Sequence, residues 1–374
     1  MEQVKKTKEI KIGGFSHINP VFIGGNNPIV IQSMWKEKLS LSVLESAAAK
    51  IEKLGLMGCG LLRFAVPDME AAELLGRLAG MVSMPLAADI HFDYKIALRC
   101  MDFPVAKIRI NPGNIGGIEK VRLVLEKAAA GKIPIRIGVN AGSLPHDLRN
   151  QVENGILSTA QALFKAAKTE IDIFEDFGFK DYLVSMKAST IADTIIANRF
   201  FAEASGLWDQ NPPLHIGVTE AGPLAAGVVR NTAALMTLLT EGIGDTIRVS
   251  LSDTMENEVI AGREILNGAF QLAGDNKRLK REGVNIISCP RCGRHSFDTH
   301  GFTDRWLPKL YAMNKDITAA IMGCEVNGPV EAKHADIGIT GAGDKVLIFK
   351  YGEIIKTINA DEADVVFEEE LRNL

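Results

Sequence analysis

The sequence predicts an α/β fold, in which an N-terminal (β/α)8 TIM barrel is followed by a smaller α+β domain. Eight short segments rich in β-branched residues recur over roughly the first 270 residues, and each is followed by a turn and a helical pattern. Polar residues recur at alternate positions where these segments end. A charged stretch then interrupts the alternation, and a second series of strand patterns follows it.

The eight predicted strands belong to residues 1–273, the expected barrel domain. They have the sequences IVIQSM, GLLRFAV, PLAADIH, VAKIRINPG, IPIRIGVN, YLVSMKAS, LHIGVTEAG and TIRVSLS. The stretches between them, such as SVLESAAAKIEKLG and NTAALMTLLTEGIG, read as amphipathic helices that end in glycine. A doubly wound sheet is the competing fold, but no strand here carries G-x-G-x-x-G.

The second domain is expected over residues 284–374, after a charged linker at 274–283 with the sequence GDNKRLKREG. Its predicted strands are VNIISC, ITAAIMGC, ADIGITG, KVLIFKYG and EIIKTIN, with a helix around DRWLPKLYAMN and a last helix from Asp361. The glycine-rich GITGAGDK lacks the spacing of a phosphate-binding loop, so we expect a turn between strands there.

Composition limits the classes of function. The 374 residues are 47% hydrophobic, and 42 Lys and Arg against 46 Asp and Glu give a formal charge of −4, which provides no basic surface for nucleic acid. No apolar run approaches the ~20 residues of a membrane helix, and the start MEQVKKTKEIKIGG lacks the apolar centre of a secretory signal. We therefore expect a cytoplasmic protein with no nucleic-acid or membrane partner.

Polar residues at the strand ends predict a binding site. In a barrel, strand residues two apart point the same way, and the active site lies at the C-terminal rim. Guanidinium groups suit phosphate oxygens, so arginines and a lysine at one mouth predict an anionic ligand such as a diphosphate. An isolated Arg or Lys could instead simply end a strand and pair with an acidic loop residue. The residues placed at this rim are Arg63, Asp89, His91, Arg109, Asn111, Arg136, Asn140, Ser185, Lys187, Ser189, Glu220, Arg248 and Ser250.

Three of the five cysteines predict a metal centre in the second domain. Cys289 and Cys292 form a C-x-x-C, and Cys324 follows a later strand, whereas Cys59 and Cys100 lie in apolar contexts typical of inert core thiols. Three thiolates suit a [4Fe–4S] cluster with one iron left for another ligand, or a structural zinc completed by histidine. The local pattern leaves both open, and the histidines available to zinc are His295, His300 and His334.

The motifs together resemble one family. SCPRCGR and MGCEVNGPVEA in the second domain, with DIHF, KIRINPGN, IRIGVNAGSL, VSMKAS, HIGVTEAG and GDTIRVSL before them, make the chain similar to the 4-hydroxy-3-methylbut-2-enyl diphosphate synthases over nearly its whole length. The resemblance implies an iron–sulfur oxidoreductase of the non-mevalonate isoprenoid pathway. Such an enzyme opens and dehydrates 2-C-methyl-D-erythritol 2,4-cyclodiphosphate reductively, with two electrons from ferredoxin or flavodoxin.

The resemblance also implies the cluster ligands. A [4Fe–4S] cluster would be bound by Cys289, Cys292 and Cys324, with Glu331 as the fourth ligand rather than the nearer Glu325. A carboxylate ligand can give way to substrate more readily than a thiolate. Two departures from the family are visible: Val330 stands where glycine is common, and WKEKLS follows IQSM where the family has a turn rich in threonine and asparagine.

For the barrel, the resemblance implies one set of residues around the diphosphate and another near the reacting carbons. Asp89, His91 and Glu220 belong to the second set, and Glu220 is the candidate proton donor, since a site sheltered from water would raise its pKa. Glu220 could instead pair with arginine, and His91 could be an orienting donor or a structural histidine. The diphosphate residues would be Arg63, Arg109, Arg136, Asn140, Ser143, Lys187, Arg248 and Ser250.

The resemblance further implies a head-to-tail homodimer, in which the cluster domain of one subunit covers the barrel of the other. The alternative function is a zinc-stapled barrel that acts as a hydrolase or transferase on a phosphorylated or pterin-like molecule. It explains the arginines and the C-x-x-C, but it explains Glu331 and the GCEVNGPVEA context poorly.

Overall fold

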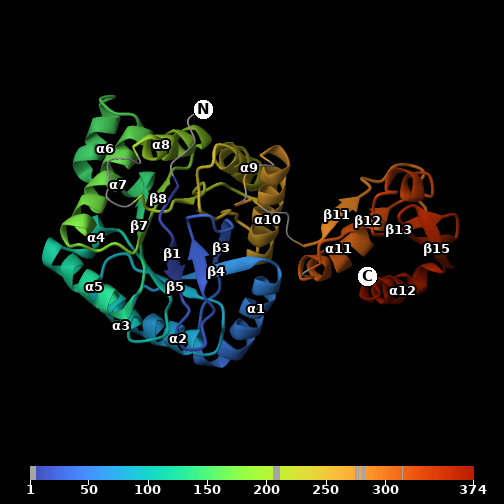
Figure 1. Ribbon diagram of the computed structural model, residues 1–374, viewed down its shortest axis with the longest axis horizontal. Helices are drawn as coiled ribbons and strands as arrows, with labels where there is room; N and C mark the ends of the chain where they lie inside the picture. Colours follow the sequence, from blue (N-terminus) through green and yellow to red (C-terminus); the bar gives the residue numbers. More distant parts are fainter. Residues whose placement is uncertain (1–5, 205–210, 274–275, 277, 280–282, 314) are drawn as a thin grey trace. The chain divides into compact units, whose positions relative to one another are not determined.

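The computed structural model describes the chain except for residues 1–5, 205–210, 274–275, 277, 280–282 and 314. The chain forms two compact units, residues 1–280 and 281–374 (Figure 1). Most of the residues predicted as a linker, 274–283, lie outside the described residues.

The first unit is a closed ring of eight parallel strands, as the sequence predicts. The ring order is β8-β7-β6-β5-β4-β3-β10-β9, and a bridge between Leu214, before β9, and Val184 of β8 closes it. A closed ring is a barrel and excludes the open doubly wound sheet. The strands are β3 (Val30–Met34), β4 (Cys59–Ala65), β5 (Leu86–Asp89), β6 (Lys107–Ile110), β7 (Ile135–Asn140), β8 (Tyr182–Lys187), β9 (His215–Ile216) and β10 (Thr246–Ile247).

Helices surround this ring (Figure 1). Several begin at side-chain caps, as at Asp68 and Thr254, and Ser158 with Gln161 forms a capping box. The two cysteines of this unit are buried, and burial raises the pKa of Cys59 to about 11 and of Cys100 to about 12, as expected of inert thiols. The outer helices are α1 (Leu44–Leu56), α2 (Met69–Ala79), α3 (Tyr94–Cys100), α5 (Ile118–Gly131), α7 (Thr159–Asp176), α8 (Ile191–Glu203), α9 (Leu224–Thr240) and α10 (Met255–Leu272), with the short α4 (Pro112–Ile115) and α6 (His146–Glu153) between them.

An N-terminal hairpin, which the sequence analysis did not predict, covers one end of the barrel. Strands β1 (Ile10–Ile12) and β2 (Val21–Ile23) pair antiparallel. The buried isoleucines of this hairpin pack against Leu61 of β4, Ala87 of β5 and Leu183 of β8. These three residues lie in the first half of their barrel strands. The hairpin therefore fills the N-terminal end of the barrel and leaves the C-terminal rim as the open end.

The second unit is an α+β domain with its own sheet. In the order β11-β12-β13-β14-β15, the first three strands are parallel and the last two pairings are antiparallel. Phe302, Trp306 and Phe367 of the two helices form an aromatic core beneath it. The elements are β11 (Asn285–Ser288), α11 (Thr299–Tyr311), β12 (Thr318–Met322), β13 (Ile337–Ala342), β14 (Lys345–Lys350), β15 (Glu353–Ile358) and α12 (Ala363–Arg372).

These elements match the five strands and two helices predicted for this part of the chain. GITGAGDK forms most of β13 and the tight turn to β14, so the turn expected there is confined to the end of this stretch. In neither unit is any described helix long and apolar enough to cross a membrane.

Candidate functional site

The C-terminal rim of the barrel is organised around Asp89, the last residue of β5. Its carboxylate lies 3.0 Å from Arg109 Nη1 and 3.5 Å from Arg63 Nε, on the two neighbouring strands. His91 Nε2 lies 3.5 Å from the same carboxylate and 3.4 Å from Arg109 Nη1. The structure thus brings together four of the residues predicted for this site.

A glycine allows Arg109 to reach across the barrel. A Cβ at Gly138 would lie 2.3 Å from Arg109 Nε, so a larger residue would displace the guanidinium. Arg109 Nη2 also donates to the Gly138 carbonyl oxygen at 3.0 Å. Position 138 on β7 therefore requires glycine, because the Arg109 side chain passes directly over it.

Deeper in the barrel lies an excess of positive charge. Arg136 is 1% exposed, and within the described part of the chain its Nε and Nη1 have no hydrogen-bond partner. Lys187 Nζ lies 3.0 Å from His215 Nε2, and Lys107 Nζ donates to Gln32 Oε1 at 2.7 Å. None of these three cations forms an ion pair with a described carboxylate. Buried polar groups are normally paired, so unpaired cationic donors indicate a site built for an anion.

The pKa values reflect this imbalance. Burial and the neighbouring arginines lower the pKa of Lys187 and of Arg136 well below their usual values. Burial alone would raise the pKa of Asp89, but Arg63, His91 and Arg109 outweigh it and hold that pKa below its usual value. Asp89 is therefore ionised and orients the rim arginines, while the deeper cations gain most from an anionic ligand.

A second carboxylate, Glu258 of α10, supports the other side of the rim. It accepts from Ser33 Oγ at 2.8 Å and from the Leu251 N–H at 3.0 Å. Lys36 Nζ lies 2.9 Å from its Oε1, whereas Arg248 Nη2 lies 3.5 Å from the same oxygen. The atypical WKEKLS loop thus reaches the rim through Lys36.

Glu220 lies in a pocket of about 400 Å³ that Arg248 and Ser250 also line. Its φ of 53° is left-handed, which is costly for a residue with a Cβ and is most often retained at functional sites. The Glu220 side chain is exposed in the barrel unit. The expectation that the barrel shelters this carboxyl group from water is therefore wrong for the barrel unit alone. Glu220 makes no ion pair with any described arginine, so the alternative role as an arginine partner gains no support.

The other predicted contacts lie along the same rim. Asn140 ends β7, and Ser143 follows in a 3-10 turn with its Oγ 3.3 Å from the Asn140 carbonyl oxygen. Ser185 is buried and turns its hydroxyl to the Ile137 carbonyl oxygen at 3.5 Å, so it is part of the barrel interior.

Four residues of this site did not emerge as candidates from the sequence. The alternation Lys107, Arg109, Asn111 carried the signal for Lys107, and His215 opens the motif HIGVTEAG. No short motif marks Gln32 or Glu258, because these side chains reach the site only through the closed tertiary fold.

The three expected cluster cysteines follow neighbouring parallel strands of the second unit. The Cys289 N–H donates to the Ile321 carbonyl oxygen at 2.9 Å, which ties the end of β11 to β12. Cys289 Sγ lies 3.7 Å from where a Cβ would stand on Gly323, the residue before Cys324. Cys324 is buried, Cys289 half-buried and Cys292 exposed.

Glu331 belongs to the same region. It ends a π-helical turn, Asn327–Glu331, that begins three residues after Cys324, and the Gly328 N–H donates to the Cys324 carbonyl oxygen at 3.0 Å. A hydrogen bond to Cys292 raises the pKa of Arg294, and the charges of Cys292, Cys324 and Glu331 act in the same direction. Val330 has an exposed side chain and a helical backbone, so the valine is tolerated there.

Three cysteines and Glu331 are a donor set that suits an iron–sulfur cluster, and one of the three histidines available to zinc is turned away from the thiols. His295 Nδ1 lies 2.7 Å from the Cys292 carbonyl oxygen and Nε2 lies 2.8 Å from Arg291 Nη2, so both ring nitrogens are engaged away from the thiols. No group of three or more His, Cys, Asp or Glu is already arranged to hold a metal ion within the described residues. The loops therefore supply suitable ligands that a bound cluster must draw together.

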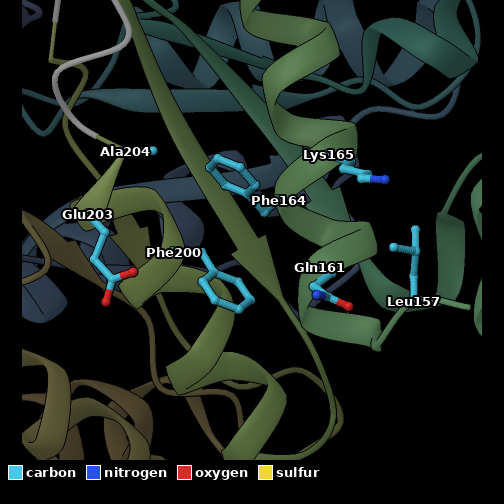
Figure 2. Close-up of a pocket in the computed structure, with 7 residues that line it drawn as sticks. All are labelled: Leu157, Gln161, Phe164, Lys165, Phe200, Glu203 and Ala204. Atoms are coloured by element: carbon cyan, nitrogen blue, oxygen red, sulfur yellow. The ribbon is translucent and has the colours of Figure 1, made fainter.

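A more voluminous pocket, about 680 Å³, lies between α7 and α8 (Figure 2). Its walls are mainly apolar, with Phe164 and Phe200 facing each other at a centroid distance of 6.3 Å. Lys165 and Glu203 are the charged residues among those that line it. It lacks the convergent charged donors of the rim, so we assign the site to the rim.

Fold and site define a TIM-barrel enzyme that has, among its described residues, buried and unpaired cationic groups at its rim and three cysteines on the loops of a second domain. Comparison with known proteins identifies the family. The GcpE TIM-barrel domain matches residues 7–263 and the GcpE protein C-terminal domain matches residues 285–373. The chain belongs to the GcpE family.

Curated relatives align along the whole chain. The chain is 48% identical to the 4-hydroxy-3-methylbut-2-en-1-yl diphosphate synthase (flavodoxin) of Treponema denticola, with 100% of both chains covered. It is 48% identical to the protein of the same name from Treponema pallidum, covering 99% of this chain and 92% of the relative. The corresponding protein of Caldicellulosiruptor saccharolyticus is 42% identical, with 95% of each chain covered.

Proposed function

We propose that this protein catalyses the reductive ring opening and dehydration of 2-C-methyl-D-erythritol 2,4-cyclodiphosphate to 4-hydroxy-3-methylbut-2-en-1-yl diphosphate, in the non-mevalonate isoprenoid pathway. Two electrons and two protons enter and one water leaves. The observation that carries the proposal is the fully buried Arg136, whose Nε and Nη1 lack a partner among the described residues while further cations lie around it. A bound diphosphate would provide the missing acceptors.

The diphosphate is bound by cations of different kinds. Arg63 and Arg109 are oriented by Asp89 and present their remaining N–H groups at the rim. Arg136 and Lys187 contribute charge that no described carboxylate neutralises, so they provide most of the electrostatic attraction. Arg248, Asn140, Ser143 and Ser250 complete the diphosphate site from the loops.

Proton transfer falls to the groups at the rim. Glu220 is the proposed donor to the departing hydroxyl, because it stands beside Arg248 and Ser250 in a left-handed backbone conformation. His91 orients the substrate through an N–H, with Asp89 as its carboxylate partner at 3.5 Å. Asp89 itself stays ionised, so it is a positioning residue rather than an acid.

The cofactor is a [4Fe–4S] cluster held by Cys289, Cys292, Cys324 and Glu331, and when bound it supplies the two electrons one at a time. The electron donor is a flavodoxin or ferredoxin, and the names of the relatives support flavodoxin. A homodimer, in which the cluster domain of one subunit covers the barrel of its partner, would supply the shelter that Glu220 lacks in the barrel unit alone. A cytoplasmic location completes the proposal.

The test is turnover of the cyclodiphosphate by anaerobically purified protein with reduced flavodoxin. We expect about four irons and four sulfides per chain, as a [4Fe–4S] cluster requires, and formation of the linear diphosphate. Glu220→Gln should bind substrate but lose turnover by about 100-fold or more. One zinc per chain without sulfide, and no product, would contradict the proposed function.

A further inference from the structure

Lys187 is held by a histidine, whereas three arginines of the rim are held by carboxylates. His215 of β9 is fully buried, and its Nε2 lies 3.0 Å from Lys187 Nζ. Its other ring nitrogen, Nδ1, lies 3.4 Å from Thr246 Oγ1 on β10. Arg63 and Arg109 instead face Asp89, and Arg248 faces Glu258.

The charge of Lys187 sets the tautomer of His215. An ammonium has only donors, so against a charged Lys187 the Nε2 atom is the unprotonated acceptor and the ring proton lies on Nδ1, directed to Thr246 Oγ1. Protonation of Nε2 would place two donors against each other. Burial and the charge of Lys187 lower the pKa of His215 well below its usual value, which agrees with a neutral ring.

The largest electrostatic effects on the pair come from positive groups, which among the described residues are Arg63 of β4, Lys107 and Arg109 of β6, Arg136 of β7 and Arg248 after β10. One buried carboxylate, Asp245, precedes Thr246; it accepts from the Leu214 N–H at 2.7 Å and pairs with Arg278. A carboxylate at position 215 would fix the ammonium but cancel its charge. A neutral imidazole fixes its direction and leaves the charge available to an anion.

We infer that His215 is a positioning residue for Lys187, whose neutral ring accepts from the ammonium and holds it for the substrate diphosphate. The inference rests on the proposed function for the identity of the anion. Thr246 supports His215 in turn, because its hydroxyl oxygen accepts a hydrogen bond from the Nδ1–H group. This keeps the ring proton on Nδ1 and leaves Nε2 free to accept. Position 217 has no room for a side chain, since a Cβ there would lie 2.4 Å from the Arg248 carbonyl oxygen and 3.1 Å from Lys187 Nζ.

The first test does not depend on the substrate. In the full-length holoenzyme labelled with ¹⁵N-histidine, and with His215→Gln to assign the signal, His215 should keep a proton on Nδ1 and none on Nε2 from about pH 6 to 9. A proton on Nε2 in this range would overturn the inference, because the ring could not then accept from Lys187. This result stands even if the protein fails to convert the cyclodiphosphate.

The second test is kinetic. His215→Leu removes the acceptor and should raise KM about 10-fold while kcat changes less than about 3-fold. It should also move the alkaline limb of the kcat/KM profile to lower pH, because the ammonium loses a hydrogen bond that favours its charged form. His215→Gln, whose amide oxygen can accept, should recover KM to within about 3-fold of the original.

Asn198→Leu provides the control for a merely structural effect. Asn198 is also fully buried, and it donates to the carbonyl oxygens of Met186 and Thr194, behind the strand that carries Lys187. This variant should lower Tm without moving the alkaline limb. If His215→Leu lowers Tm but leaves KM and the limb unchanged, the inference is wrong. If the wild-type protein does not turn over the cyclodiphosphate, the proposed function fails, and the affinity for inorganic pyrophosphate replaces KM.

Discussion

The barrel rim and the cysteine loops differ in how far each site is formed before its ligand binds. At the rim the charged side chains stand on adjacent strands, and Asp89 and Glu258 hold them within hydrogen-bond or ion-pair distance. In the second unit the cysteines stand on turns, Cys292 is exposed, and the described donors form no ready metal site.

The difference shows what each ligand must contribute. A diphosphate bound as proposed would meet cations already held by hydrogen bonds and ion pairs, so little reorganisation would oppose its binding. A cluster must order its own loops, so its binding free energy is also local folding free energy. Substitutions of the rim cations should therefore change affinity, whereas substitutions at the cysteines should abolish the site.

The largest effect is expected for Cys324→Ser. Loss of one of three thiolates should remove the iron, the sulfide and the brown absorption, and activity should fall to background, as measured on anaerobically purified protein. Cys59→Ala is the matched control, because Cys59 is a buried barrel thiol and its loss should leave the iron content unchanged. A Cys324→Ser variant that keeps four irons and normal turnover would show that the site is not built on these cysteines.

Arg136→Met tests the preformed site. Removal of this guanidinium should raise KM about 100-fold, the usual scale for a lost charge-assisted pair, while the unfolding free energy stays unchanged or rises by about 1 kcal/mol. The rise is expected because the buried cation has unpaired donors that methionine lacks. Arg199→Met, which removes a half-exposed arginine paired with Glu241, is the control and should leave KM unchanged. Weaker folding with normal KM would assign Arg136 to structure.

Much of the rim could be predicted from the sequence, because strand periodicity is local. The pairs Arg109 with Asn111 and Ser185 with Lys187 lie two residues apart, and a parallel barrel brings the ends of all its strands to one rim. The C-x-x-C of Cys289 and Cys292 is also a local spacing, and the role of these cysteines as metal ligands stays a prediction.

What the sequence did not predict depends on contacts between distant segments. Glu258 stands on α10 and reaches Ser33, 225 residues earlier in the chain. The exposure of Glu220 depends on what covers the barrel, which the sequence of the strand does not show. The N-terminal hairpin was missed for another reason: its strands have three residues each, which is too short to reveal a period of two.

Glu170→Gln tests how the burial of one carboxyl group makes the stability of the barrel depend on pH. Glu170 of α7 is buried, its Oε1 accepts from the Gly113 N–H at 3.0 Å, and burial raises its pKa to about 7 against the opposing effect of that hydrogen bond. The pKa of Glu170 is higher in the folded protein, about 7, than in the unfolded chain, about 4.3. The stability that Glu170 contributes is therefore fully present below about pH 4.3 and is lost as the pH rises through about 7.

Glutamine stays neutral and keeps the acceptor, so the variant should be about 2–3 kcal/mol more stable than wild type at pH 8 and equal to it at pH 4. Denaturant unfolding at the two pH values measures this difference. Glu153→Gln, an exposed change on α6, should give no such difference. Equal stabilities of the two proteins at both pH values would mean that folding does not raise the pKa of Glu170.

Lys36→Gln should have the smallest effect and separates two roles for the atypical loop after β3. Lys36 Nζ lies 2.9 Å from Glu258 Oε1 and donates to the Leu251 carbonyl oxygen at 2.8 Å, so it competes with Arg248 for the Glu258 carboxylate. Without Lys36, Glu258 should hold Arg248 more firmly and raise KM about 2- to 5-fold with little change in kcat.

Lys38→Gln, in the same loop and exposed, is the control for general loss of positive charge. A double-mutant cycle with Glu258→Gln then identifies the route of the effect. If Lys36 acts through Glu258, Lys36→Gln should be silent once Glu258 is neutral. If the effect of Lys36→Gln persists in that background, the lysine contacts the diphosphate itself, and the loop belongs to the substrate site rather than to its supports.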